Sequence, residues 1–199
     1  MESKEKIVQV AFNLFLTKGY RDISLREIVE NVGLSKGAFY HYYKSKEELF
    51  TEVVERYVLN ASDAIYDKLP KKNLKSFMTG YLSLLVKFID QINISASGFG
   101  EKDSVTYYNL IFEAMRLLPE FKEKIHEVHK REREAWVEVI RNAKASGEIV
   151  TNFDDTHLAK LFICSNDGLG MHVILEGRLK DIFQEISSVW NGIYKLIEA

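Results

Sequence analysis

Two helix-start signals frame a very short helical unit near the N-terminus. Ser24-Leu-Arg-Glu27 and Ser45-Lys-Glu-Glu48 both follow the capping-box pattern, in which a serine and a glutamate satisfy free backbone N–H groups at the start of a helix. Between them, Gly33 predicts a break and Ser35 predicts the start of another helix. The chain between the boxes therefore has room only for short helices, whose stability must come from packing rather than from propensity.

The rest of the chain carries helix signals and no strand signals. An amphipathic pattern over 3–18 precedes the short helices, and the helix that begins at Ser45 is expected to end before Pro70. Later helices are expected at 74–94, 104–118, 120–145, 156–176 and 180–198. We therefore predict an all-α protein of about nine helices. A three-helix helix-turn-helix head would occupy 1–46 and a larger helical body 47–199, with 47–69 as the connecting helix.

The amino-acid composition indicates the cellular compartment in which the protein is expected. Of 199 residues, 46% are hydrophobic and 28% are charged, which is typical of a globular protein. The single Cys164 excludes an intrachain disulfide and suits a reducing cytoplasm. No uncharged apolar stretch has the length of a membrane span, and the N-terminal residues lack a signal-peptide pattern. We therefore expect a cytoplasmic protein with no membrane partner.

Charge is distributed unevenly along the chain. Residues 17–46 contain six Lys and Arg and three Asp and Glu, a net charge of +3, whereas the whole chain has a net charge of −2. A small basic head on an acidic body indicates two functions, and a basic patch is what nucleic acid requires. Alone, this gradient is a weak signal.

The third helix has more aromatic residues than one face can bury. Helical spacing turns Phe39 and Tyr43 toward the core of the head, together with Leu34 and Ala38. The other face then carries Lys36, Gly37, Tyr40, His41 and Tyr42. Tyrosine hydroxyls and lysine ammonium groups donate to phosphate, and a glycine lets another backbone come close. This face is therefore a candidate surface for DNA.

The sequence resembles the DNA-binding head of the TetR family of bacterial transcriptional regulators, over SLREIVENVGLSKGAFYHYYKSKEELF and the preceding AFNLFLTKGYRDIS. The resemblance implies a homodimer that places two recognition helices in successive major grooves of a palindromic double-stranded DNA operator. By position, it implies phosphate contacts from Ser24, Tyr40 and Lys46. Contacts at or near base edges would come from Lys36, Gly37, Ala38, His41 and Tyr42. Ser35 is also expected among the DNA-binding residues.

The last two expected helices are apolar around more than one face. Hydrophobic residues cover nearly the whole circumference of LAKLFICSNDGLGMHVIL, and the final helix has a stripe too wide for one contact. Core on one side and a partner subunit on the other would explain this, as would an ordinary thick core. The family resemblance implies a four-helix dimer interface. We expect it to include Leu169, His172, Val173, Ile186, Val189, Trp190 and Ile193.

Polar residues on apolar helix faces point to a candidate effector pocket in the body. Glu132 falls in the middle of an apolar stripe, and a buried carboxylate needs a partner. That partner could be a ligand cation, His172 or Arg116, and a purely structural pairing is an equal alternative. Aromatic residues at helical spacing are also often plain core. The predicted pocket residues are Tyr81, Phe88, Tyr108, Phe112, Met115, Glu132, Trp136, Asn166 and Asp167.

The main competing function is an all-α enzyme. Glu123 and His126 have the spacing of a di-iron helix motif, but the chain has no second copy of that motif. It also lacks a glycine-rich phosphate loop and a nucleophile elbow, so we predict no enzyme, no metal and no cofactor. We expect a sequence-specific transcriptional regulator, a repressor released from its operator by an unknown small-molecule effector. A DNA-binding regulator controlled by another protein is the alternative.

Overall fold

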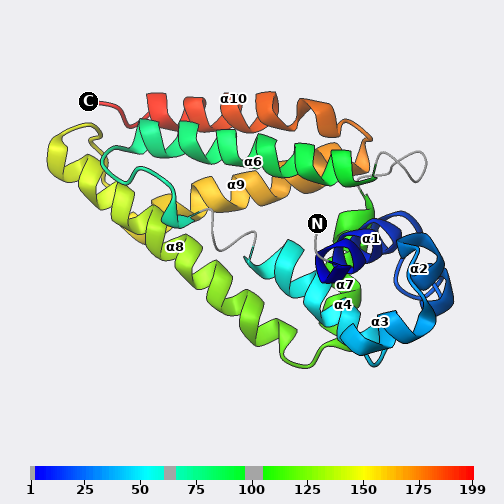
Figure 1. Ribbon diagram of the computed structural model, residues 1–199. Coiled ribbons are helices and arrows are strands. Elements are labelled where there is room, and N and C mark those ends of the chain that lie inside the picture. The colour runs from blue at the N-terminus through cyan, green and yellow to red at the C-terminus, as the bar shows by residue number, and fades with distance from the viewer. Residues whose placement is uncertain (1–2, 61–65, 97–104) are drawn as a thin grey trace. The chain divides into compact units, whose positions relative to one another are not determined.

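The computed structural model describes residues 3–60, 66–96 and 105–199, and all of its regular elements are helical (Figure 1). Nine α-helices among these residues confirm the all-α prediction, and the one β-bridge in the same residues joins Ile149 to Glu198. The elements are α1 Ser3–Lys18, α2 Leu25–Val32, α3 Lys36–Tyr42, α4 Lys46–Val54, the π-helical turn η1 Glu55–Leu59, α6 Leu74–Ala96, α7 Val105–Leu117, α8 Phe121–Ser146, α9 Asp155–Leu175, the 3-10 turn η2 Leu179–Asp181 and α10 Ile182–Lys195.

The chain forms two compact units. Unit 1 comprises residues 1–61 and 91–125, and unit 2 comprises residues 62–90 and 126–199. Unit 1 thus contains α7 as well as the first four helices. The functional boundary that we predict at residue 46 stays a prediction. The connecting helix expected over 47–69 is not a regular α-helix, because η1 follows α4, and residues 61–65 lie outside the described part.

Local capping sets the helix ends of unit 1. The Ser24, Ser35 and Ser45 hydroxyls each accept a backbone N–H three residues on, at 3.1, 3.2 and 3.1 Å. Gly33 ends α2 with φ at +74°, a left-handed conformation that favours glycine. Helix α1 is buried all round over residues 11–16 and packs against α2, α4 and α7. It is therefore the central helix of unit 1.

Unit 2 encloses one aromatic core. Figure 1 shows α6, α9 and α10 running alongside one another, and buried residues of these helices and of α8 form a single cluster. The Trp136 ring stacks on Phe162 at 4.9 Å, and Trp190 meets Trp136 edge-on at 5.0 Å. The Trp190 indole N–H donates to the Phe162 carbonyl and the Ser165 hydroxyl, both at 3.1 Å. Trp190 therefore lies at the centre of this core.

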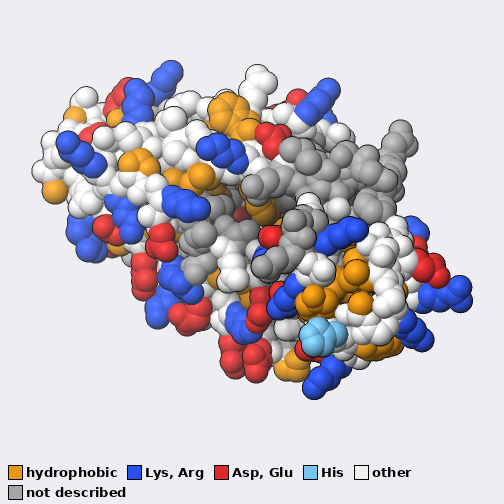
Figure 2. All heavy atoms as spheres, in the orientation of Figure 1, with side chains coloured by type: hydrophobic (Ala, Val, Ile, Leu, Met, Phe, Trp, Pro, Cys, Tyr) orange, Lys and Arg blue, Asp and Glu red, His pale blue; other side chains and the backbone are white. Residues whose placement is uncertain are grey.

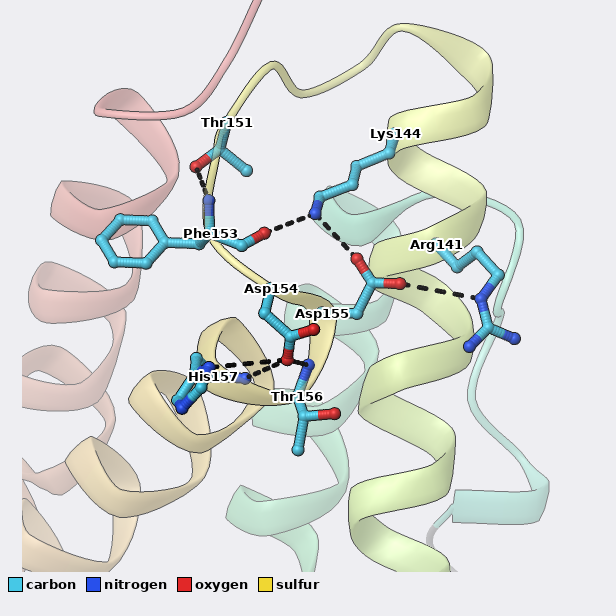
Figure 3. A network of polar contacts seen from close by, with 8 residues as sticks. All are labelled: Arg141, Lys144, Thr151, Phe153, Asp154, Asp155, Thr156 and His157. Atoms are coloured by element: carbon cyan, nitrogen blue, oxygen red, sulfur yellow. Dashed lines mark hydrogen bonds and ion pairs between the residues drawn. The ribbon is translucent and has the colours of Figure 1, made fainter.

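A polar network joins α8 to α9 (Figure 3). Asp154 caps α9, because its carboxylate accepts the Thr156 N–H at 2.9 Å. Lys144 of α8 donates to the Phe153 carbonyl at 2.6 Å and pairs with Asp155 at 2.7 Å. Each charged group drawn there has a partner among the residues drawn, so the network has a structural role and connects the end of α8 to the start of α9.

Candidate nucleic-acid interface

The inner face of α3 holds this short helix in place. Phe39 and Tyr43 are buried, as the helical spacing predicts, and their rings lie 6.0 Å apart. The Tyr43 hydroxyl donates to the Glu52 carboxylate of α4 at 2.8 Å. Burial and this hydrogen bond raise the pKa of Tyr43. Side-chain packing thus stabilises a helix too short to be stable alone.

The outer face of α3 is exposed. Lys36, Gly37 and His41 are accessible to solvent, and Tyr40 and Tyr42 are 44% and 37% exposed. In the described part of the chain, the polar side-chain atoms of Lys36, Tyr40, His41 and Tyr42 form no hydrogen bond or ion pair. The His41 ring meets the Tyr42 ring edge-on at 5.4 Å. Around α3, Figure 2 shows hydrophobic-class and histidine side chains with Lys and Arg beside them. This face is free to contact a partner.

Two acidic residues of the head are paired within the head. Glu27 forms an ion pair with Lys18, and Arg26 pairs with Glu30 at 2.7 Å. The first turn of α3 contains no acid. Lys44, exposed just after α3, is an additional cation that the predicted set omits, although its position directly after the helix could have identified it. The surface around α3 therefore presents cations whose nearby acids are partly neutralised.

Gly37 lies inside α3 without an internal reason for being glycine. Its backbone is not in the left-handed region, and a Cβ built at this position would have no heavy atom within 4 Å. Glycine in a helix costs about 0.5–1 kcal/mol relative to alanine. The chain itself would thus be more stable with alanine, and the space beside Gly37 is open to another molecule.

Lys46 has contacts within the head that the sequence did not suggest. Its ammonium group donates to the backbone carbonyls of Tyr20 and Ile23, both at 2.7 Å, and lies 4.2 Å from the centre of the Tyr20 ring. Two of its three hydrogens are therefore used within the protein, so Lys46 holds the α1–α2 turn, and its phosphate contact stays a prediction for the third hydrogen. Ser24 and Ser35 are caps whose hydroxyl hydrogens remain able to donate, and Ala38 is half-buried.

The predicted dimer residues divide into two groups. Val173, Ile186 and Trp190 have no accessible surface, because all three belong to the core of unit 2. They cannot contact a partner, and their assignment to an interface is corrected. Leu169 and Ile193 are half-buried, and His172 and Val189 are exposed.

The surface of α9 and α10 also has exposed apolar residues that the predicted interface list does not contain. Leu161, Leu175 and Phe183 are 44%, 73% and 46% exposed, and Gly168 and Gly192 have open space where a Cβ would lie. On α9 these positions follow the helical spacing of one stripe. By length and composition α9 could also cross a membrane, the one helix of the described residues that could. A helix between a core and a partner subunit has the same composition.

The predicted effector residues lie in both units. Tyr108, Phe112 and Met115 belong to α7 in unit 1, where Phe112 is 57% exposed. In unit 2, Tyr81, Glu132 and Trp136 are buried, and Phe88 and Asn166 are half-buried, with exposed Asp167 beside Asn166. The predicted effector pocket therefore stays a prediction, with its residues divided between units 1 and 2.

Glu132 has a partner that the sequence did not suggest. The Tyr66 hydroxyl donates to its carboxylate at 2.5 Å, and neither His172 nor Arg116 does so. The amide of Asn166 donates to the Tyr81 hydroxyl at 3.1 Å and to Asp167 at 3.3 Å. Among the described residues, no Lys or Arg forms an ion pair with Glu132. Burial is the largest cause that raises the pKa of Glu132, to about 7.

We expect Glu132→Gln to stabilise unit 2 above pH 7 and to have little effect near pH 5. The pKa of Glu132 rises from an ordinary 4.5 to about 7 on folding, so the folded protein binds a proton that the unfolded chain releases between those values. Stability of the wild type is thereby lost as pH rises from 4.5 to 7, by about 3 kcal/mol. Glutamine can still accept from Tyr66. Urea unfolding of both proteins from pH 5 to 8 measures the difference, and a constant difference would contradict this explanation.

No metal site is present among the described residues, because no three His, Cys, Asp or Glu side chains converge there. Glu123 and His126 thus belong to no such group.

Comparisons with known proteins agree with this geometry. A family model described as bacterial regulatory proteins of the tetR family matches residues 7–53. The regulator YerO of Bacillus subtilis is 37% identical over 81 residues, which are 37% of this chain and 28% of YerO. YuxN of the same organism is 45% identical over 58 residues, which are 29% of this chain and 20% of YuxN. This chain therefore matches less than a third of the length of either relative. The biofilm operon negative regulator IcaR of Staphylococcus epidermidis is 26% identical over 78% of this chain and 72% of IcaR.

Solved structures show the same fold over the whole chain. NemR of E. coli has a TM-score of 0.68 and 16% identity, and the match covers 96% of this chain and 97% of NemR. A putative transcriptional regulator of Saccharomonospora viridis, solved with choline, has a TM-score of 0.69 and 18% identity over 100% of this chain and 98% of its own.

Proposed function

We propose that this chain, whose residues 7–53 match the tetR family model, is a regulator of the TetR family and acts as a cytoplasmic, sequence-specific repressor without catalytic activity. The observation that carries the proposal is the outer face of α3. Lys36, Tyr40, His41 and Tyr42 are exposed there, and their polar atoms have no described partner within the chain. A helix with such a face fits the major groove, where its side chains reach base edges.

The side chains of this face have different proposed roles. Lys36 can donate to the O6 and N7 acceptors of guanine, and His41 can reach a neighbouring base edge. The hydroxyls of Tyr40 and Ser24 donate to phosphate oxygens, which positions the head without reading sequence. Gly37 leaves room for the DNA to approach the helix backbone. Sequence preference should therefore depend on Lys36 and His41, and overall affinity on Tyr40.

We expect Lys36→Ala to change the preferred DNA sequence and Tyr40→Phe to weaken binding to every sequence. A lost base contact costs about 1–3 kcal/mol at one position, and a lost phosphate hydrogen bond costs about 1 kcal/mol. Selection from random duplexes gives the preference of the wild type and of each variant, and titration of the selected duplex gives affinity. Lys130→Ala, which removes an exposed cation of α8, is the control. If both α3 variants bind like this control, α3 is not the recognition helix.

We propose that a second copy of the chain covers the exposed stripe of α9 and α10. Gly168 and Gly192 lie inside helices on accessible surface with open Cβ space, so no described residue requires glycine there. Close approach of a helix from a partner subunit would require it. Exposed Leu161, Leu175 and Val189 supply apolar area beside them. A dimer with two-fold symmetry presents two α3 helices, which supports a palindromic operator.

We also propose that a small-molecule effector controls the repressor. Supporting this are the buried polar groups of Tyr66, Tyr81 and Glu132 in an otherwise apolar core, and a structural relative solved with choline. The effector would favour a dimer that does not fit the operator, and helix α4 would transmit the change. It must bind the two states with different affinity, because otherwise no population shifts.

A metabolite panel tests control by an effector. Compounds that raise the melting temperature are titrated into the complex of the protein with its selected duplex, and the effector is expected to release the DNA. If every stabilising compound leaves the affinity for DNA unchanged, the protein-controlled alternative is favoured.

A further inference from the structure

The turn between α1 and α2 is held by side chains from two distant helices. Lys46 at the start of α4 donates to the Tyr20 carbonyl at 2.7 Å, and the Tyr20 hydroxyl donates to Glu47 at 2.9 Å. On the other side, the Tyr20 backbone N–H donates to the Glu113 carboxylate of α7 at 2.9 Å. Tyr20 is thus the residue at which α4 and α7 both contact the turn.

We propose that Glu113 is a positioning residue for DNA binding: through the Tyr20 backbone N–H it fixes the α1–α2 turn, and it thereby makes operator affinity depend on the position of α7. This inference rests on the proposed function and goes beyond it, because the proposed route of control runs through α4. Glu113 adds a second connection, from α7 to the α1–α2 turn, in which no residue of α4 takes part.

The hydrogen bond from the Tyr20 N–H to Glu113 is strong enough to couple the position of the turn to that of α7. A carboxylate that accepts a backbone N–H forms a charge-assisted bond, stronger than a neutral one. Glu113 is only 19% exposed at its side chain, so water competes little for it. Its other described contact, to Arg116 at 3.4 Å, is an exposed pair of small energetic value. The bond to Tyr20 is therefore the principal one that Glu113 makes.

A cavity lies beside the hydrogen bond between Tyr20 and Glu113. About 580 Å³ of space is lined by the end of α1, the turn and four residues of α7, Asn109, Phe112, Glu113 and Arg116. Helix α7 packs against α1 and α4, but across this space no side chain transmits a shift of α7 to the turn. The polar contact from Glu113 then has a correspondingly larger share in positioning the turn.

The turn leads directly to the predicted DNA surface. Ile23, whose carbonyl also accepts from Lys46, precedes Ser24, and the Ser24 hydroxyl caps α2. Phosphate contacts set the register of a protein on DNA, so a small displacement of Ser24 should lower affinity for all sequences. A shift of α7 that breaks the bond to Tyr20 should have this effect.

Two conservative variants of Glu113 separate the effect of its hydrogen bond to Tyr20 from the effect of its negative charge. Glu113→Asp keeps the charge but shortens the side chain, so it loses the Tyr20 N–H; Glu113→Gln loses the charge but keeps an oxygen at the same distance. We expect Glu113→Asp to bind the selected duplex about fivefold more weakly. Glu113→Gln should bind at least as tightly as the wild type, because removing a negative charge favours DNA. Hydrogen exchange of the Tyr20 amide should accelerate only in Glu113→Asp.

The matched controls are Glu120→Asp and Glu120→Gln, since Glu120 is an exposed acid of the same unit. Melting curves verify that all four variants are folded. Wild-type affinity in Glu113→Asp, or equal weakening in Glu113→Gln, would overturn the proposal. Failure of the wild type to bind any selected duplex would instead overturn the proposed function, so the two failures can be distinguished.

Discussion

We expect the Gly37→Ala variant to melt at a higher temperature than the wild type and to bind its operator at least about tenfold more weakly. The two effects have opposite signs because they have different causes. A Cβ at position 37 meets no described atom beyond the backbone of its own helix, so alanine gains helix stability of up to about 1 kcal/mol. In the complex, the same methyl group would occupy space that we assign to DNA.

Melting curves and titration of the selected duplex measure both effects on one protein sample. The higher melting temperature is the internal control, because it shows that weaker binding does not arise from a damaged head. Unchanged affinity in a more stable protein would remove Gly37 from the DNA-binding surface. A lower melting temperature would show that the space beside Gly37 is filled within the chain.

We expect Gly168→Arg to give a folded monomer and Trp190→Asp to give an unfolded unit 2. Gly168 is exposed with open Cβ space, so an arginine there disturbs only a partner that approaches α9. Trp190 is fully buried, and its indole N–H has two acceptors. Replacing it by a carboxylate creates a cavity and buries a charge, which together cost about 4 kcal/mol or more.

Light scattering and circular dichroism separate these outcomes. Gly168→Arg should have half the wild-type mass with full helical content, and its operator affinity should fall by a factor of about 100 because one half-site is lost. Glu134→Arg places the same charge on exposed α8 and should remain dimeric. A dimeric Gly168→Arg protein would exclude the α9 stripe as the interface, and a folded monomeric Trp190→Asp protein would restore the original assignment.

The fold class and the capped helices of the head could be predicted because they depend on local order. Ser24, Ser35 and Ser45 each accept from a residue three positions on, so the pattern of residue types contains both partners. The inner and outer faces of α3 follow from helical spacing in the same way. The family resemblance then identified the head, and the family match over residues 7–53 agrees with it.

The contacts of Lys46 within the head could not be predicted, because its acceptors lie 26 and 23 residues away at Tyr20 and Ile23. A lysine beside a basic head looks the same in sequence whether it contacts phosphate or a carbonyl. The partner of Glu132 is 66 residues distant, and the Glu113 contact with Tyr20 spans 93. Long-range polar pairs of this kind leave no periodic signal.

Sequence alone determined the helical class of this protein, the short helices of its head and the aromatic face that we assign to DNA, since each depends on neighbours within one or two helical turns. Tertiary structure decided which side of the apolar helices is core. Trp190 and Val189 are adjacent in the chain, yet one is fully buried and the other is 37% exposed. Apolar side chains satisfy a core and a partner surface equally well, so only the packing of α9 and α10 against the rest of unit 2 separates the two.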